Sequence, residues 1–494
     1  MLFNSQIFLL FFLPVTVAGF LLMMTSGRTR AGVAWLVLTS LFFYGWWNPI
    51  YLVLIAGSIG FNYFIGAKIA AAPTIAKRAL LGFGVAGNLA TLGYFKYAGF
   101  LAANLSALGG FAVDVGDIVL PLGISFFTFQ QIAYLVDASR GETASHDFLH
   151  YCLFVCFFPQ LIAGPIVHHQ HVLPQFKRFE NYRFDAGMFG DGLFLLLLGL
   201  FKKVVFADTA ATYASPIFGA ADAGLEVTFF EAWAGAIAYT LQIYFDFSGY
   251  SDMALGLGRM FGIRLPLNFN SPYKALSIID FWRRWHMTLS AFLRDYLYIP
   301  LGGNRGGAVA RYRNLLATML LGGLWHGASW TFVAWGALHG SYLVVNHLWR
   351  TTTASQQLAG TLVFKVFAWV LTFLCVVVAW VLFRSLTFAG AADMLHAMIG
   401  GNGFVLPAQI AKVIPWLPGF VTTTGTMPLL AGGTVMGVVE MLGMFAIMAV
   451  ALSMPNLYEQ RGWQKLLAVL LTFYFTVQAV FFTRIPSEFL YFQF

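Results

Sequence analysis

Two histidines lie in parts of the chain where a titratable ring costs free energy. His326 stands in the stretch GGLWHGASWTF, and no Asp, Glu, Lys or Arg occurs between Asn314 and Trp349. His286 stands in FWRRWHMTLSAF, and each of the two histidines directly follows a tryptophan. Ionisable residues in such apolar surroundings are unfavourable unless satisfied, which makes them functional candidates. A single buried histidine is more often a hydrogen-bonded core residue, but two in such segments favour a functional role.

Proton transfer at a hydroxyl is the chemistry that these histidines can perform. A neutral imidazole can take a proton from a hydroxyl and return it to a leaving group. The chain has no GxSxG nucleophile elbow and no HExxH motif, and Cys152, Cys156 and Cys375 lie in apolar segments typical of core residues. No carboxylate cluster accompanies the histidines, so we expect no metal ion and no bound cofactor. Acyl transfer from a thioester to a hydroxyl needs only a histidine base. A third histidine, His339 in WGALHGSY, is expected to line the same helix bundle as His286 and His326.

Basic and aromatic residues surround His286 in the sequence. Residues 277–300 predict one amphipathic helix, because Ser277 and Asp280 form a capping-box pattern and apolar residues recur at helical spacing. Its arginines either reach lipid headgroups or clamp a phosphorylated cytoplasmic donor, since guanidinium groups bind phosphate in a bidentate manner. The candidate donor site comprises Arg283, Arg284, Arg294, Arg305, Trp282 and Trp325.

Two acidic residues lie in the preceding motif FDFSGYSD. Asp246 and Asp252 are expected near the cytoplasmic entrance through which the donor would reach the histidines. There they either orient a histidine or cap a helix. Both interpretations stay open, because a carboxylate can serve either purpose. The glycines that follow, in ALGLGRMFG, miss the spacing of a dinucleotide-binding loop.

The composition restricts the chain to one broad class. Of 494 residues, 59% are hydrophobic and only 10% are charged, whereas a soluble domain carries about 25% charged residues. We therefore expect an all-α polytopic membrane protein with about ten to twelve spans. The net charge of +8 comes without a Lys/Arg-rich run, which argues against nucleic acid as a partner. The N-terminus lacks the basic start of a cleaved signal peptide, so we expect it to remain as a span.

Interruptions in the apolar segments predict a cavity. Pro121 and Gly123 break one segment, and Pro159, Gly164 and Pro165 break another. Irregular backbone at membrane depth is tolerated only when it is buried in protein or lines a cavity. We expect 314–324 and 328–349 to be half-helices that meet at His326. The apolar segments lie near 7–25, 32–48, 50–70, 79–95, 117–137, 148–167, 188–207, 228–247, 314–324, 328–349, 363–383, 434–454 and 464–483.

Loop charges predict the orientation of the chain. Basic loops face the cytoplasm, so we place there SGRTRAG, the Lys77–Arg78 pair and 259–313. The loops 208–227 and 385–433 are poor in Lys and Arg and are expected outside, together with the C-terminus. The basic loop 168–187 conflicts with simple alternation, which predicts one re-entrant segment between 97 and 187.

Longer motifs carry a family resemblance. FWRRWHMTLSAFLRDYLYIPLGGNR, LLGGLWHGASWTFVAWGALHG and LQIYFDFSGYSDMALGLG together resemble the membrane-bound O-acyltransferases, and among them the alginate O-acetyltransferase branch. LPLGISFFTFQQIAYLVD, FFPQLIAGPI and LGYFKYAGF resemble that branch as well. The likeness runs nearly from end to end and is weakest in 168–230 and 387–433.

The resemblance implies a fold, a reaction and partners. It implies one domain over 1–494 with core motifs in 240–350, built as about eleven transmembrane helices with re-entrant helices around a tunnel. His326 matches the catalytic histidine of the family, and His286 matches its second position. The implied donor is a cytoplasmic acetyl thioester, acetyl-CoA, at a bacterial inner membrane. The implied acceptor is an exopolysaccharide such as alginate, reached through periplasmic SGNH-type acetyltransferase or esterase partners.

The last residues of the chain add a second resemblance. FLYFQF resembles the F-[IL]-Y-x-x-F tail of small partner proteins in the D-alanylation system, and Tyr491 falls on its tyrosine. We expect the tail, 484–494, on the extracytoplasmic side, where Tyr491 could accept the acetyl group in cis. The alternative is an aromatic anchor at the membrane interface.

Other functions compete with this reading. Peptidoglycan or a cellulose-like polymer could replace alginate as the acceptor with the mechanism unchanged. A proton-coupled transporter or flippase would also use intramembrane histidines, but it would not consume acetyl-CoA. A scaffold without chemistry would hold periplasmic enzymes and would not need His326.

Overall fold

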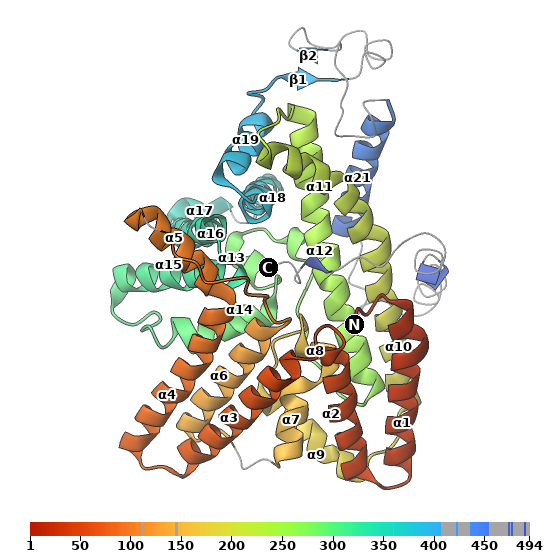
Figure 1. Ribbon diagram of the computed structural model, residues 1–494. Coiled ribbons are helices and arrows are strands. Elements are labelled where there is room, and N and C mark those ends of the chain that lie inside the picture. The colour runs from red at the N-terminus through yellow and green to blue at the C-terminus, as the bar shows by residue number, and fades with distance from the viewer. Residues whose placement is uncertain are drawn as a thin grey trace.

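Most of the chain that the structure describes is helical. The computed structural model describes residues 1–110, 112–143, 147–358, 360–406, 421–422, 435–453, 473–474, 476–477 and 489–490. Within these residues the only sheet is a parallel pair of two-residue strands, β1 (Phe404–Val405) and β2 (Val421–Thr422), at one end of the bundle (Figure 1). The predicted all-α class is therefore confirmed.

The helices follow one another in four groups, with η marking π and 3-10 turns. The first group is η1 (Phe8–Phe12), α1 (Leu13–Thr25), α2 (Thr29–Gly45), α3 (Tyr51–Ala71), α4 (Thr74–Leu92), η2 (Gly93–Tyr97), α5 (Ala98–Gly109) and α6 (Ile124–Arg140). The second is α7 (Phe148–Cys156), α8 (Phe158–Leu161), α9 (His169–Lys177), η3 (Arg178–Asn181), α10 (Ala186–Phe201), η4 (Lys202–Ala207), α11 (Asp208–Asp222) and α12 (Phe229–Met260). The third is η5 (Pro272–Lys274), α13 (Ile278–Trp282), α14 (Met287–Leu293), η6 (Arg294–Tyr298), α15 (Gly307–His326) and α16 (Trp330–Trp349). The fourth is α17 (Thr353–Leu358), α18 (Leu362–Arg384), α19 (Phe388–Met398) and α21 (Val435–Ser453).

Most predicted apolar segments coincide with helices. Three helical segments of the described chain are long and apolar enough to cross a membrane, namely Phe8–Thr25, Tyr51–Ala71 and Leu362–Arg384. The total of about eleven spans stays a prediction. The predicted segment 464–483 lies almost wholly outside the described residues.

The long helix α12 extends well beyond the apolar segment that predicted it. The prediction ended at residue 247, whereas the helix continues through a polar stretch to Met260. Helix α10 covers this extension at close range, because a Cβ atom on Gly192 would lie only 2.6 Å from the carbonyl oxygen of Gly256. The glycines of ALGLGRMFG thus serve helix packing, and the buried polar side chains of α12 are shielded from lipid.

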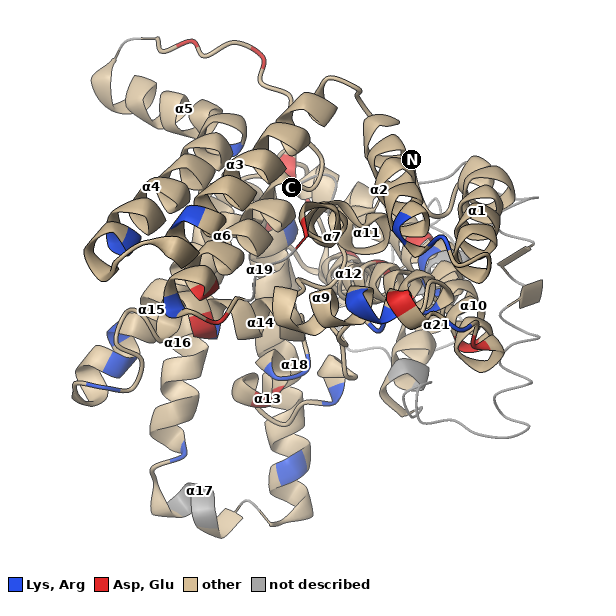
Figure 2. Ribbon diagram, turned by 90° about the horizontal axis from the view of Figure 1, so that it is seen from below, with Lys and Arg blue, Asp and Glu red and all other residues tan. Residues whose placement is uncertain are grey.

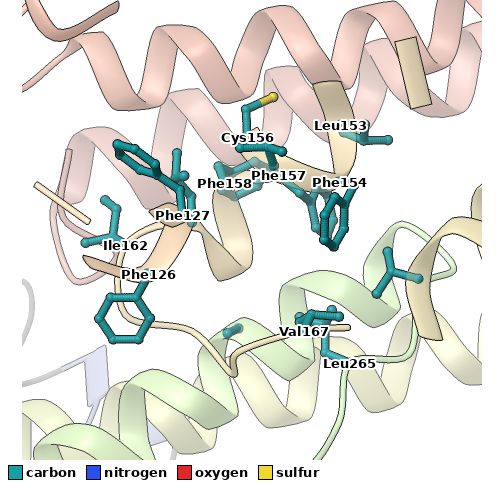
Figure 3. Close-up of a cluster of buried hydrophobic side chains, with 14 of the residues drawn as sticks. Phe126, Phe127, Leu153, Phe154, Cys156, Phe157, Phe158, Ile162, Val167 and Leu265 are labelled. Atoms are coloured by element: carbon teal, nitrogen blue, oxygen red, sulfur yellow. The ribbon is translucent and has the colours of Figure 1, made fainter. Parts of the chain in front are cut away.

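Both predicted interruptions are present. Helix α6 begins directly after Gly123, whose φ of 72° is the left-handed conformation that favours glycine. The second interruption separates α7 and α8 from an irregular return through 162–168. Figure 3 shows this region as part of a hydrophobic core in which Phe126, Phe154, Phe158 and other apolar residues pack together.

Helices α7 and α8 form a short segment within the region where one re-entrant segment was predicted. Its start is tied to the turn after α1 by an ion pair between Arg30 and Asp147 at 3.6 Å. Its end lies beside α6, where the Gln170 amide donates a hydrogen bond of 3.3 Å to Glu142. Both ends of this segment therefore lie at the same end of the bundle, as a re-entrant segment would require. The re-entrant segment between 97 and 187 stays a prediction.

Basic segments gather at this end. Phe20 of α1 packs against Phe179 and Tyr182, with ring centroids 5.6 and 5.5 Å apart, so the loop after α9 lies beside the α1–α2 turn. Figure 2 views this end and shows basic segments beside α2, α9 and α10. The connection between α11 and α12 lies at the opposite end (Figure 1). The α1–α2 region and the basic loop 168–187 therefore share one end of the bundle, and the placement of the basic loops in the cytoplasm stays a prediction.

The single amphipathic helix predicted for 277–300 is wrong. The structure breaks it into α13, α14 and η6, with His286 between the first two in a left-handed conformation (φ 42°). The predicted cap at Ser277 is present, since its hydroxyl accepts a hydrogen bond from the Asp280 amide. At the break, the Met287 amide donates a hydrogen bond of 2.9 Å to the carbonyl of Asn268, which lies in an irregular segment earlier in the chain. Local periodicity cannot predict a break that a non-local contact imposes.

Candidate active site

His326 is the last residue of α15. Gly327 follows in an extended conformation, and Ser329 then caps α16, so the chain reverses direction directly after the histidine. Helix α15 is continuous through Gly322 and Gly323. A Cβ atom on Gly323 would collide with the Phe332 carbonyl of α16. Gly323 therefore lets the two helices approach closely behind His326.

Aromatic rings enclose His326. Its ring centroid lies 4.9 Å from Trp325, 5.2 Å from Trp335 and 5.2 Å from Phe383. The residue is 5% exposed. A small cavity of about 40 Å³ adjoins it, lined by Lys96, Leu120, Pro121, Leu122, Gly123, Ile124, Ser125, Phe126, Ile162, Trp325 and His326. A substrate that enters this cavity meets a histidine from which bulk water is largely excluded.

His286 is fully buried and held by one amide side chain. Its Nδ1 atom lies 2.9 Å from Oδ1 of Asn268. The hydroxyl of Thr288 donates to the same oxygen at 2.9 Å, and Nδ2 of Asn268 donates to Ser251 at 3.2 Å. Because Oδ1 can only accept, Nδ1 of His286 carries the proton, and Nε2 is the acceptor nitrogen of the neutral ring. Asn268 thereby fixes both the orientation and the tautomer of His286.

The backbone at His286 carries strain. A φ of 42° is unfavourable for a residue with a Cβ atom, and glycine would adopt it without steric cost. Such strain, of about 1–3 kcal/mol, persists where the surrounding structure demands it, and it clusters at functional sites. A histidine in this position indicates that the imidazole itself is required.

His339 completes a group that we term the histidine cluster: His286, His326 and His339. Nδ1 of His339 accepts a hydrogen bond of 3.3 Å from the Trp282 indole, and its ring lies 4.9 Å from Trp335. The His286 ring lies 6.4 Å from Trp325, which also borders His326. The structure thus gathers the three predicted histidines around Trp325, Trp335 and Trp282. Trp282 and Trp325, which were predicted at the donor site, lie among the aromatic rings around this cluster.

The four predicted arginines lie away from the cavity lining. Nε of Arg284 donates to Asp280 at 3.0 Å, and Arg294 makes two hydrogen bonds to Asp295, at 2.6 and 2.8 Å. Arg283 and Arg305 are exposed. Two of the four guanidinium groups are therefore engaged by neighbouring carboxylates, and the other two remain the better candidates for a phosphate.

Asp246 and Asp252 do not cap a helix, because both lie inside α12. Asp246 pairs with Lys203 at 2.7 Å, and Asp252 pairs with Lys202 at 2.6 Å. Lys203 also pairs with Asp208 at 3.0 Å. We term these five residues the ion-pair cluster. The carboxylates hold the π turn η4 against α12, as expected of buried charges that must be paired.

The described part of the C-terminal tail reaches this cluster. The Leu490 amide donates a hydrogen bond of 2.9 Å to Oδ2 of Asp246. Phe489 is 1% exposed and packs on Tyr250, with ring centroids 4.9 Å apart. Phe489 is thus an interior residue rather than an interfacial anchor. Tyr491, the predicted acyl acceptor, lies outside the described residues.

Sequence reasoning missed two residues at the site. Asn268 orients His286, and the Lys96 ammonium reaches the end of the helix that carries His326. A lysine within the apolar stretch LGYFKYAGF was a signal, because isolated charges inside a membrane are functional candidates. Asn268 offered no comparable signal, since it lies in an ordinary loop sequence.

Comparison with known proteins places this site in a family. Residues 135–385 match the model of the membrane-bound O-acyltransferase family (MBOAT). The chain is 46% identical over 434 residues to the peptidoglycan O-acetyltransferase of Helicobacter pylori, covering 82% of this chain and 81% of the relative. It is 45% identical over 405 residues to the probable alginate O-acetylase AlgI of Pseudomonas aeruginosa, covering 81% and 75%. It is 43% identical over 413 residues to the probable alginate O-acetylase AlgI of Azotobacter vinelandii, covering 82% and 79%.

The matched segment, 135–385, contains the whole histidine cluster and most of the surrounding aromatic residues. The relatives extend the similarity over four-fifths of the chain, well beyond that segment. The resemblance seen in the motifs is therefore confirmed, and the chain belongs to the membrane-bound O-acyltransferase family.

Proposed function

We propose that this acyltransferase moves an acetyl group from acetyl-CoA in the cytoplasm to an acceptor on the opposite face of a bacterial inner membrane. The observation that carries the proposal is the histidine cluster, three buried imidazoles in an aromatic enclosure beside a cavity. A neutral ring tolerates such surroundings better than a carboxylate and can still exchange a proton.

The reaction assigns His326 as the general base. The acceptor hydroxyl oxygen attacks the thioester carbonyl carbon while His326 takes the hydroxyl proton. The tetrahedral intermediate then expels the CoA thiolate, which receives the proton back from His326. Trp325, Trp335 and Phe383 limit water at the site, which protects the thioester from hydrolysis. His286, with Nε2 as acceptor nitrogen, is the second catalytic candidate.

The donor enters from the basic end. We infer that Arg283 and Arg305, which are exposed, contact the phosphates of acetyl-CoA and that Arg284 and Arg294 contribute charge nearby. The remaining architecture belongs to the same proposal: about eleven spans around a tunnel, with the C-terminus outside.

The acceptor is a carbohydrate polymer of the cell envelope. Alginate is our first candidate, and the H. pylori relative, named for peptidoglycan O-acetylation, supports that polymer as the alternative. Periplasmic SGNH-type partners would complete the transfer to the sugar hydroxyl. Tyr491 would carry the acetyl group between the two steps, and the burial of Phe489 and Leu490 supports this role because it ties the tail to the interior.

The test is the fate of acetyl-CoA in a His326→Ala variant. The purified full-length chain should release CoA from acetyl-CoA, and the variant should lose this activity by about 10²- to 10⁴-fold. His347→Ala is the matched control, because His347 lies near the far end of α16. Retained acetyl-CoA consumption in His326→Ala would contradict the proposed role of His326. Polymer acetylation that persists in His326→Ala while the purified chain consumes no acetyl-CoA would favour a scaffold. A chain that never consumes acetyl-CoA would favour a transporter.

A further inference from the structure

Two consecutive side chains from the N-terminal part of the protein reach the end of the helix that carries His326. The Lys96 ammonium donates hydrogen bonds to the carbonyl oxygens of Trp325, at 2.6 Å, and His326, at 3.0 Å. The Tyr97 hydroxyl donates to the carbonyl oxygen of Leu324 at 2.9 Å. Three successive carbonyls of α15 are thus satisfied by residues about 230 positions earlier in the chain.

These contacts fit the physical needs of a helix end. The last carbonyls of a helix have no partner within the helix, and the end of the helix carries partial negative charge. A lysine ammonium and a phenol satisfy both requirements. Lys96 and Tyr97 belong to the π turn η2, an element that occurs often at functional sites.

Capping does not use the full donor capacity of Lys96. An ammonium has three N–H donors, and two of them go to the carbonyls of Trp325 and His326. The third N–H donor points to the Ser125 hydroxyl, whose oxygen lies 3.5 Å from the Lys96 nitrogen, a long distance for a hydrogen bond. Lys96, Ser125 and His326 all line the same cavity. A ligand oxygen in that cavity can therefore meet both an imidazole and an ammonium.

We propose that Lys96 is a further catalytic residue, whose ammonium stabilises the oxyanion that forms on the acetyl group. The inference rests on the proposed function. When the hydroxyl oxygen bonds to the thioester carbon, the carbonyl π electrons move to oxygen, and the hydroxyl proton moves to His326. The oxyanion accepts the third N–H of Lys96 in place of Ser125. When the carbonyl re-forms, the carbon–sulfur bond breaks, and the departing thiolate takes the proton from His326.

Lys96 is suited to this task by its surroundings. The ammonium lies 5.9 Å from the centroid of the Trp325 ring, and most of the other side chains that line the cavity are apolar. A fixed cation in a site of low polarity stabilises developing negative charge far more strongly than it would in water. Because the carbonyls of α15 hold the ammonium before substrate arrives, little reorganisation accompanies the reaction.

The competing explanation is that Lys96 only caps α15. Four variants of the full-length chain separate the two roles by CoA release from acetyl-CoA, with kcat and KM determined separately. Lys96→Met removes the charge and the donors, Lys96→Gln keeps amide donors without charge, and Lys96→Arg keeps both. Tyr97→Phe removes the neighbouring cap from the same helix end and leaves the ammonium in place.

Oxyanion stabilisation predicts a specific pattern. Lys96→Met and Lys96→Gln should each lose about 10²- to 10³-fold in kcat with KM for acetyl-CoA nearly unchanged. Lys96→Arg should retain more activity than Lys96→Gln, and Tyr97→Phe should lose less than about tenfold, the effect of one neutral hydrogen bond. Full activity in Lys96→Gln, or equal losses in Tyr97→Phe and Lys96→Met, would overturn the inference in favour of capping.

Thermal unfolding in detergent shows whether each variant is folded. If Lys96→Met fails to fold, Lys96→Gln decides the outcome, because its amide retains donors that can cap α15. His326→Ala separates this inference from the proposed function. Activity in both His326→Ala and Lys96→Gln would end the proposed function itself. Loss in His326→Ala with activity in Lys96→Gln would end only the role of Lys96.

Discussion

The histidine cluster and the ion-pair cluster are both buried, yet they satisfy their polar groups in different ways. The ion-pair cluster contains full charges matched within 3.0 Å, such as Lys203 with Asp246 and Asp208. The histidine cluster places rings among tryptophans, with an amide contact at His286 and an indole contact at His339. A buried charge demands an oppositely charged partner, whereas a neutral imidazole needs only hydrogen bonds. The first cluster therefore holds helices together, and the second gathers groups that can exchange a proton.

Removing one partner from the ion-pair cluster should have the largest effect on stability. Asp246→Ala leaves Lys203 with a single carboxylate and deprives the Leu490 amide of its acceptor. We expect the free energy of unfolding to fall by about 3–5 kcal/mol, as for other broken buried pairs. Chemical unfolding in detergent measures the change.

A double variant provides the control for that prediction. Asp246→Leu combined with Lys203→Met replaces the pair by apolar groups, which is often neutral for stability. We expect it to recover most of the stability lost in Asp246→Ala. A loss below about 1 kcal/mol in Asp246→Ala would instead equate this pair with a surface ion pair and remove the contrast between the two clusters.

Replacing Asn268 should lower the rate of acetyl transfer, because Asn268 orients His286 in the histidine cluster. Asn268→Ala removes the acceptor that fixes Nδ1 of His286, so the ring can rotate or change tautomer. We expect kcat for CoA release to fall about 10- to 100-fold, the scale of a misplaced catalytic group. Asn268→Asp, which keeps the acceptor oxygen, should retain more activity than Asn268→Ala.

A second buried asparagine offers a matched comparison. Asn88 donates to Asn62 at 2.6 Å and to the Gly84 carbonyl at 2.8 Å, in α3 and α4, away from the histidines. Asn88→Ala should destabilise the fold to a similar degree but leave kcat per folded molecule unchanged. Equal loss of kcat in both alanine variants would mean that Asn268 acts only through stability.

The contrast also explains what the sequence could predict. Apolar length and glycine or proline breaks are local signals, so α3, α18, α21 and the break at Gly123 were predictable. His326 was predictable because no charged residue surrounds it in the sequence. The ion pairs of Asp246 and Asp252 were not, since their partners lie 43 and 50 residues away and only the packing of η4 on α12 joins them.

Non-local contacts also decide the geometry of the active site. The strained turn at His286 depends on backbone contacts with Asn268, and the end of α15 depends on Lys96 in a different helical group. A motif can therefore identify the histidine, but it does not contain the residues that orient it. The π turns η2 and η4, which present Lys96 and Lys203, give no periodic signal of their own.

Exposed arginines should show the smallest effect, because water and salt screen their charges. Arg283→Ala and Arg305→Ala should each raise KM for acetyl-CoA by about two- to fivefold without changing kcat, and the effect should shrink as salt rises. Arg78→Ala is the control, since Arg78 is exposed and does not belong to the proposed donor site. An unchanged KM in the first two variants would assign these arginines to lipid headgroups. Donor recognition would then depend on the buried cavity rather than on the surface, and the difference between buried and exposed charge would extend to binding as well as to stability.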